Sequence, residues 1–122
     1  MRRPSLALAL ALAAVAAPAV AGEADVVDVV VRATGDGVYA FDVTVRHADE
    51  GWDHYADRFE IVAPDGTVLG TRVLAHPHVT EQPFTRSLSG VAIPASMSEV
   101  TVRAHDGVHG LGGAERTISL PR

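Results

Sequence analysis

The chain has 122 residues, with ten arginines, no lysine, 15 acidic residues, six histidines and no cysteine. Its formal net charge of −5 becomes −7 when Arg2 and Arg3 are left out, because eight arginines then stand against 15 carboxylates. An acidic surface repels phosphate groups, which argues against nucleic acid and anionic membranes as partners, and a chain without cysteine cannot use disulfides for stability.

The first 21 residues have the features of a signal peptide. Two arginines precede an apolar run over 6–17, and "AVA" at 19–21 is a small-residue cleavage sequence. The run is too short for a good membrane span, and Pro18 interrupts a helix near its end. We therefore predict a signal peptide over 1–21 and a single domain over 22–122, located in the periplasm or secreted. No cysteine follows the run and no later stretch is apolar enough to span a membrane, so we expect neither a lipid anchor nor membrane association after cleavage.

The remainder of the chain has the pattern of short strands separated by turns. In "VYAFDVTVRH", 38–47, apolar residues alternate with polar ones, which predicts a half-buried antiparallel strand. "TGDG" at 34–37 and "PDG" at 64–66 are turn sequences. The same criteria predict strands over 25–33, 38–47, 58–63, 67–75, 84–91, 99–104 and 114–120.

About seven short strands without an amphipathic helix predict an all-β fold, a two-sheet antiparallel sandwich. The closing segment "VTVRAHDGVHGLGGAERTISLP" resembles the last hairpin of fibronectin type III and bacterial immunoglobulin-like domains, without the antibody-type cysteine pair. The longer pattern "GWDHYAD", "HPHVTEQPFTR" and "HDGVHGLGG" resembles a group of small secreted bacterial proteins of unassigned function. These resemblances imply export and an immunoglobulin or fibronectin III-like sandwich, and they imply no functional residues.

The histidines fall in alternate connections between the predicted strands. Strands of an antiparallel sandwich alternate in direction, so every second connection lies at the same end of the molecule. The histidine-bearing connections are the loop 48–57, the "HPHVTEQPF" loop at 76–84 and the glycine-rich loop 105–113. We therefore expect all six histidines at one end, provided that no strand has been missed.

Imidazoles gathered in this way suggest a site for a divalent transition metal. Histidine is a common ligand of zinc and copper(II), and the lack of cysteine argues against a soft copper(I) site. Carboxylates are available in the same loops, at Asp53, Asp57, Glu81 and Asp106. The predicted metal ligands are His54, His76, His78, His105 and His109. His47 ranks last because it is expected to end a strand. The alternative is that these are ordinary loop histidines, hydrogen-bonded to nearby carbonyl groups, since an H-x-H pair alone is a weak motif.

Other residues admit two interpretations. Trp52 and Tyr55 form either a platform for a protein partner or a sugar, or a plug over the end of the core. The glycines of the last loop are expected to adopt positive φ; they are Gly107, Gly110, Gly112 and Gly113.

The sequence contains no recognisable catalytic motif, because its serines lack a nucleophile-elbow context. We therefore expect a non-enzymatic, exported metal-binding protein with a carrier, sensor or accessory role. The alternative is a protein–protein interaction module that uses the same loops. An enzyme acting through a metal-bound water is the least supported hypothesis.

Overall fold

The computed structural model describes residues 22–121, and the predicted signal peptide lies outside this range. The described residues form eight strands, and no helix among them is long and apolar enough to cross a membrane. The strands are β1 (Asp25–Gly35), β2 (Val38–Arg46), β3 (Ala56–Val62), β4 (Val68–Val73), β5 (Phe84–Ala92), β6 (Glu99–Asp106), β7 (Gly110–Leu111) and β8 (Arg116–Ser119).

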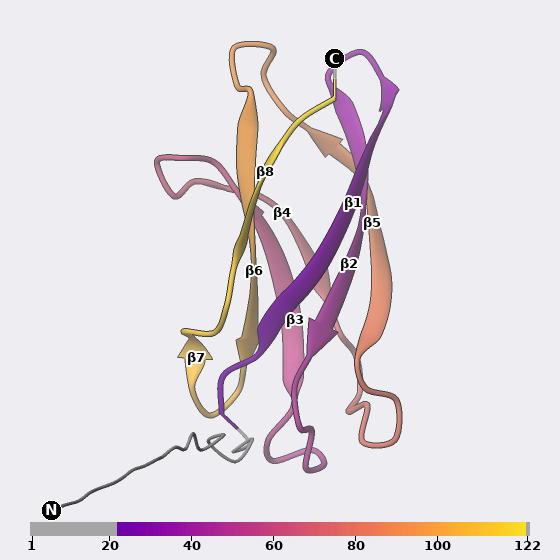
Figure 1. Cartoon of the computed structure of the whole chain (residues 1–122), viewed down its shortest axis with the longest axis vertical. Coiled ribbons are helices and arrows are strands. Elements are labelled where there is room, and N and C mark those ends of the chain that lie inside the picture. Colours follow the sequence, from indigo (N-terminus) through magenta and orange to yellow (C-terminus); the bar gives the residue numbers. More distant parts are fainter. Residues whose placement is uncertain (1–21, 122) are drawn as a thin grey trace, which may run out of the picture.

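The strands form two antiparallel sheets that face each other (Figure 1). One sheet has three strands in the order β1-β2-β5. The other has five strands, in which β4, β3 and β6 are neighbours and both β7 and β8 pair with the far side of β6. The predicted all-β sandwich is therefore confirmed.

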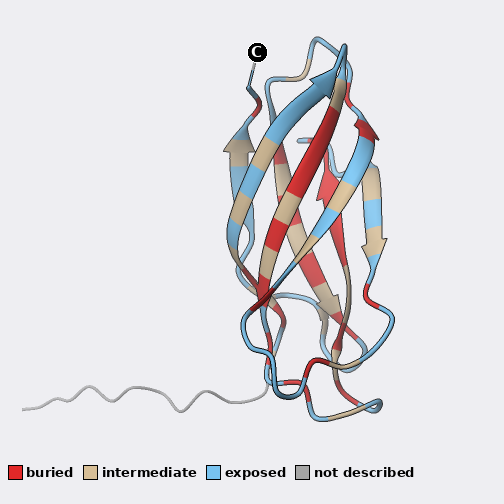
Figure 2. Ribbon diagram, turned by 90° about the vertical axis from the view of Figure 1, so that its right-hand side faces the viewer, coloured by how far each residue is buried: buried red, intermediate tan, exposed pale blue. Residues whose placement is uncertain are grey.

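The core lies between the sheets, where the inward positions of the alternating strands meet. Tyr39, Phe41, Val43 and Val45 of β2 are all buried, as the alternation predicts. Figure 2 shows this alternation as bands of different burial along the strands. Full burial of one large apolar side chain contributes about 1.5–3 kcal/mol, so this double layer can hold the domain together without disulfides.

The predicted and observed strands differ most near the end of the chain. The glycine-rich stretch 105–113 was expected to be a loop, but β6 continues through His105 and Asp106, and β7 follows almost at once. Gly110 has a φ of 73°, which lets the chain turn back so that β7 pairs with β6. The sequence does not predict this strand, because two residues are too few to show an alternation of apolar and polar side chains.

Two glycines of this stretch serve close packing instead of a turn. Gly107, Gly112 and Gly113 do not have positive φ, so that expectation was wrong for three of the four glycines. A Cβ on Gly113 would overlap the backbone carbonyl of Ala24, and one on Gly112 would crowd the side chain of Glu23. The missing side chains therefore allow the segment just before β1 to lie against this loop.

Candidate metal centre

All the histidine-bearing connections lie at one end of the sandwich. The β2–β3, β4–β5 and β6–β7 connections are at the lower end in Figure 1, as the alternation of strand direction predicts. The missed strand β7 begins after His109 and therefore does not move that residue to the opposite end. Although they share this end, the six rings divide into separate groups.

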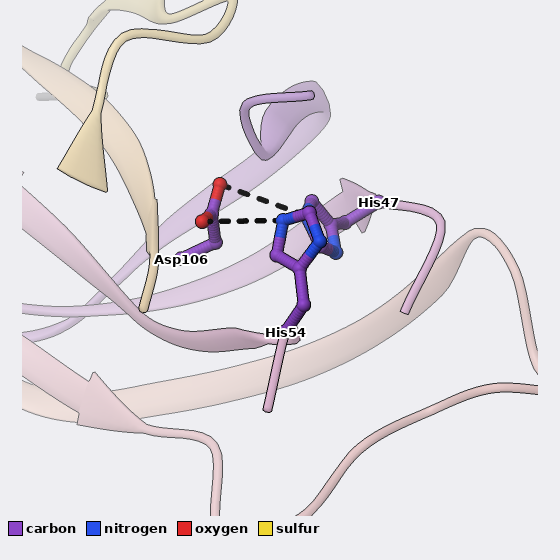
Figure 3. A group of neighbouring side chains, drawn as sticks. All are labelled: His47, His54 and Asp106. Atoms are coloured by element: carbon purple, nitrogen blue, oxygen red, sulfur yellow. Dashed lines mark hydrogen bonds and ion pairs between the residues drawn. The ribbon is translucent and has the colours of Figure 1, made fainter. Parts of the chain in front are cut away.

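The central group consists of His47, His54 and Asp106 (Figure 3). All three residues are buried, and their potential ligand atoms lie within 4.8 Å of one another. The Nε2 atoms of the two imidazoles are 3.2 Å apart. Nε2 of His47 is 3.5 Å from Asp106 Oδ2, and Nε2 of His54 is 3.4 Å from Asp106 Oδ1. Two segments distant in sequence, the β2–β3 connection and the end of β6, thus bring two nitrogens and a carboxylate to one point.

Strand alternation explains two of these three positions. In β6 the inward positions are Val100, Val102, Ala104 and Asp106, so the carboxylate occupies the last core position of that strand. His47 follows β2 directly and continues the inward series of Val43 and Val45. Both side chains are fully buried for the same reason as the apolar residues before them.

Each imidazole of the group is oriented by a second carboxylate. Nδ1 of His47 lies 2.6 Å from Asp49 Oδ1, and Nδ1 of His54 lies 2.7 Å from Glu50 Oε1. A carboxylate accepts a hydrogen bond, so Nδ1 carries the proton, and Nε2 of a neutral ring then presents a lone pair. Histidines that bind metals usually have such a carboxylate behind them, because it fixes the tautomer and the orientation of the ring.

Asp106 presents a buried carboxylate oxygen to this group. Its Oδ1 accepts hydrogen bonds from the backbone N–H groups of Val108, at 2.8 Å, and His109, at 2.6 Å. Burial alone would raise the pKa of Asp106, but these two N–H groups, together with the imidazoles of His47 and His109, lower the pKa below its ordinary value. Among the described residues, Oδ2 has no hydrogen-bond partner. This oxygen therefore accepts no hydrogen bond within the described part of the chain, and Nε2 of His47 lies 3.5 Å from it.

The charges of the group call for a cation. The side chains of Asp49 and Asp106 are fully buried, and a buried charge is costly unless it is paired. With both imidazoles neutral, two lone pairs face each other at 3.2 Å. One proton between them would supply a single positive charge, whereas protons on both Nε2 atoms would place N–H against N–H. A divalent ion would balance both buried carboxylates.

The spacing of the group suits a small metal ion. Two ligand atoms at about 2.0–2.1 Å from a tetrahedral zinc ion lie about 3.3–3.4 Å apart. The observed separations of 3.2, 3.4 and 3.5 Å are close to that value. His109 is a further candidate ligand, since its Nδ1 is 3.3 Å from Asp106 Oδ1 and its ring centroid is 4.9 Å from that of His54. The residues present therefore fit a divalent ion with nitrogen and oxygen ligands.

His76 and His78 form a separate pair. Their ring centroids are 4.6 Å apart, and the His78 ring stacks on Phe84 at 4.0 Å. His76 is exposed, whereas His78 is buried, and both ring nitrogens of His78 lack a hydrogen-bond partner among the described residues. Burial, with the charge of Arg86 and of His76, lowers the pKa of His78. The H-x-H motif lies near the central group but contributes no ligand atom to it.

His105 also lies outside the central group. It pairs with Asp57 through Nδ1 and Oδ1 at 2.6 Å, and both side chains are partly exposed. Of the five predicted ligands, His54 is in the central group and His109 borders it, while His76, His78 and His105 are elsewhere. The low rank of His47 is not supported by the geometry, because the strand that it follows directs its side chain inward. Asp49 and Glu50 were not singled out, although their spacing from His47 and His54 could have indicated them.

Trp52 and Tyr55 lie in the same connection as His54. Their rings meet edge to face, with centroids 5.7 Å apart. Trp52 is 69% exposed, so the interpretation of this residue as a plug over the core is wrong. The platform interpretation stays a prediction.

Comparison with known proteins gives one informative similarity. No protein-family model matches the sequence, and no solved structure matches it. A protein of Halomicrobium mukohataei named "Putative lipoprotein" is 44% identical over 96 residues, which are 79% of this chain and 47% of that protein. The chain therefore spans about half the length of this relative.

Proposed function

We propose that this protein is an exported domain that binds a divalent transition metal, zinc or copper(II), through His47, His54 and Asp106. The observation that carries the proposal is the 3.2 Å approach of two imidazole Nε2 atoms, each with a carboxylate on its Nδ1, beside a buried carboxylate oxygen that has no hydrogen-bond partner within residues 22–121. Two neutral rings with their Nε2 lone pairs at this distance repel each other; one proton removes the repulsion, but only a divalent ion also balances both buried carboxylates. Ligands of this hardness suit zinc and copper(II).

A non-enzymatic role fits the burial of the ligands. Catalytic zinc sites keep an open position for water or substrate, whereas structural sites are closed. Here the side chains of His47 and Asp106 are fully buried, and that of His54 is 10% exposed. We infer a carrier, sensor or accessory function, in which the ion is held and released without reacting.

Export rests on the N-terminal sequence and on the relative. The apolar run over 6–17 and the "AVA" sequence suit a secretory signal, and the similar protein carries the name of a lipoprotein. Both support a location in the cell envelope, periplasmic or secreted. The three- and five-stranded sheets support the resemblance to immunoglobulin or fibronectin III-like domains.

Metal titration of the protein beginning at Gly22 tests the proposal. A ligand that binds the folded state alone stabilises it by about 2.7 kcal/mol at a free concentration of 100 times Kd, which a melting curve detects easily. We expect zinc or copper(II) to raise the melting temperature, and His54→Ala to abolish the rise. His76→Ala is the matched control and should keep it. An unchanged melting curve at saturating metal would refute the proposal.

An interaction module is the second candidate function. The specific observation that favours it is the exposure of Trp52, a large aromatic side chain that contributes strongly to protein interfaces when it is buried by a partner. Failure of the metal titration would leave this function ahead.

A further inference from the structure

The backbone at the start of the described chain reaches the candidate metal centre. The carbonyl oxygen of Gly22 lies 3.0 Å from Nε2 of His47, the same atom that faces His54 and Asp106. We propose that Gly22 is a main-chain ligand of the metal, through its carbonyl oxygen and, after removal of residues 1–21, through its free α-amine. This inference rests on the proposed metal-binding function and adds that signal-peptide cleavage completes the site.

The segment that carries Gly22 is held firmly against the last loop. The N–H of Val26 donates to the carbonyl of Ala114 at 2.8 Å, and the N–H of Ala114 donates to Asp25 Oδ1 at 2.7 Å. Ala24 is fully buried, and its carbonyl approaches so closely that Gly113 has no room for a side chain. Gly22 is two residues from this anchor, so its position beside His47 follows from packing that the fold requires.

The chemistry of the backbone nitrogen changes when the chain is cut before Gly22. In an uncut chain this nitrogen belongs to a peptide bond, and its lone pair is delocalised into the carbonyl group. A free α-amine has an available lone pair. The amine nitrogen and the carbonyl oxygen of one residue can close a five-membered ring with a single ion. Cleavage therefore converts Gly22 from one weak oxygen ligand into a chelating pair.

An open pocket adjoins Gly22 and His47 on one side of the buried group. A pocket of about 430 Å³ is lined by Gly22, His47, Asp49 and Gln82, among others, and it borders the buried group. Such an entry path is a requirement for a site filled after folding. The order of events that follows is export, cleavage and then metal loading, so the uncut precursor binds metal more weakly than the processed protein.

The chain offers a clean chemical test, because it has no lysine. In the protein that begins at Gly22 the α-amine is the sole primary amine, so acetylation blocks it and leaves the carbonyl oxygen and every side-chain ligand in place. The experiment compares the copper(II) affinity of the protein with a free α-amine with that of the acetylated protein. Acetylation should weaken binding at least about tenfold, the lower end of the effect of losing a contact that supports a metal ligand. It should also remove one ligating nitrogen from the copper(II) electron paramagnetic resonance spectrum, and leave the metal-free melting temperature unchanged.

Protection of the amine provides the reciprocal measurement. Bound copper(II) should slow acetylation of Gly22 in the wild-type protein, and His54→Ala should remove this protection. Equal copper affinity before and after acetylation would overturn the amine ligand, and with it the role of cleavage, while leaving the metal site intact. If neither the free nor the acetylated protein bound copper(II), the metal site itself would be overturned, and this inference with it.

Discussion

At the scale of single residues, the candidate site depends on carboxylates that do not bind the metal. Asp49 is fully buried and links three groups: it accepts from His47 Nδ1, from the N–H of Ala56 at 3.0 Å and from the N–H of His78 at 2.6 Å. It therefore connects the β2–β3 and β4–β5 connections while it orients an imidazole. Glu50 has the same task toward His54, but its side chain is 60% exposed.

Replacement of Asp49 tests this orienting role. Asp49→Asn keeps the shape but weakens the interaction with His47 Nδ1, so metal affinity should fall about 10- to 100-fold, as for other groups behind a ligating histidine. Glu50→Gln, at an exposed position, is the matched control and should have a smaller effect. Isothermal titration with zinc measures both affinities, and equal losses for the two variants would contradict the distinction.

A second residue-scale prediction concerns acid stability. Glu60 is buried beneath Arg58 and Arg103, which donate to it at 2.8 and 2.9 Å. Burial alone would raise the pKa of Glu60, but these hydrogen bonds and charges lower it below its ordinary value. A lowered folded-state pKa gives stability that is present above the ordinary value of about 4.3 and lost as pH falls through the folded pKa. Glu60→Gln should therefore lose less unfolding free energy than the wild type between pH 5 and pH 3, in urea melts.

At the scale of elements, the site lies where strands end and connections begin. β6 delivers Asp106 from its last inward position, and β2 delivers His47 from the residue after its end. The loop between β6 and β8 packs on the segment before β1, through the close approach of Gly113 to Ala24. The geometry of the site therefore depends on contacts between elements that are far apart in sequence.

Substitution of Gly113 measures how much the close packing of Gly113 against Ala24 contributes to stability. Gly113→Ala places a Cβ against the backbone of Ala24, which cannot move easily, so the protein should lose about 1–3 kcal/mol of stability, as for other overpacked sites. Gly112→Ala meets the flexible side chain of Glu23 and should cost less. Urea denaturation of both variants provides the comparison. A larger loss for Gly112→Ala would show that the backbone contact is not the constraint.

At the scale of the whole molecule, the candidate site joins the two sheets at one end. His47 follows β2 of the three-stranded sheet, and Asp106 ends β6 of the five-stranded sheet. His54 lies in the connection that passes from one sheet to the other. An ion at this point would cross-link the two sheets, in a protein that has no disulfide.

Hydrogen exchange can detect a metal ion that cross-links the two sheets. Zinc should slow amide exchange in both sheets near the histidine end, and it should have little effect at the end that carries the β1–β2 and β3–β4 turns, because local opening is suppressed where the ion binds. Protection confined to one sheet would mean that the ion does not bridge the layers.

The sequence by itself determined the fold class, the strand directions and the end at which the histidines lie. The alternation of Tyr39, Phe41, Val43 and Val45 reports on neighbours along one strand, and the order of strands and turns then determines which connections share an end. Only the tertiary structure decided which histidines meet. His47 follows a strand of one sheet and Asp106 ends a strand of the other, so their distance depends on how the two sheets pack together. The spacing of residues along the chain does not predict that packing. The alternation of β2 and β6, which directs His47 and Asp106 inward, indicated the candidate site better than the H-x-H motif did. The direction of a side chain, and not its sequence neighbour, decides what it can bind.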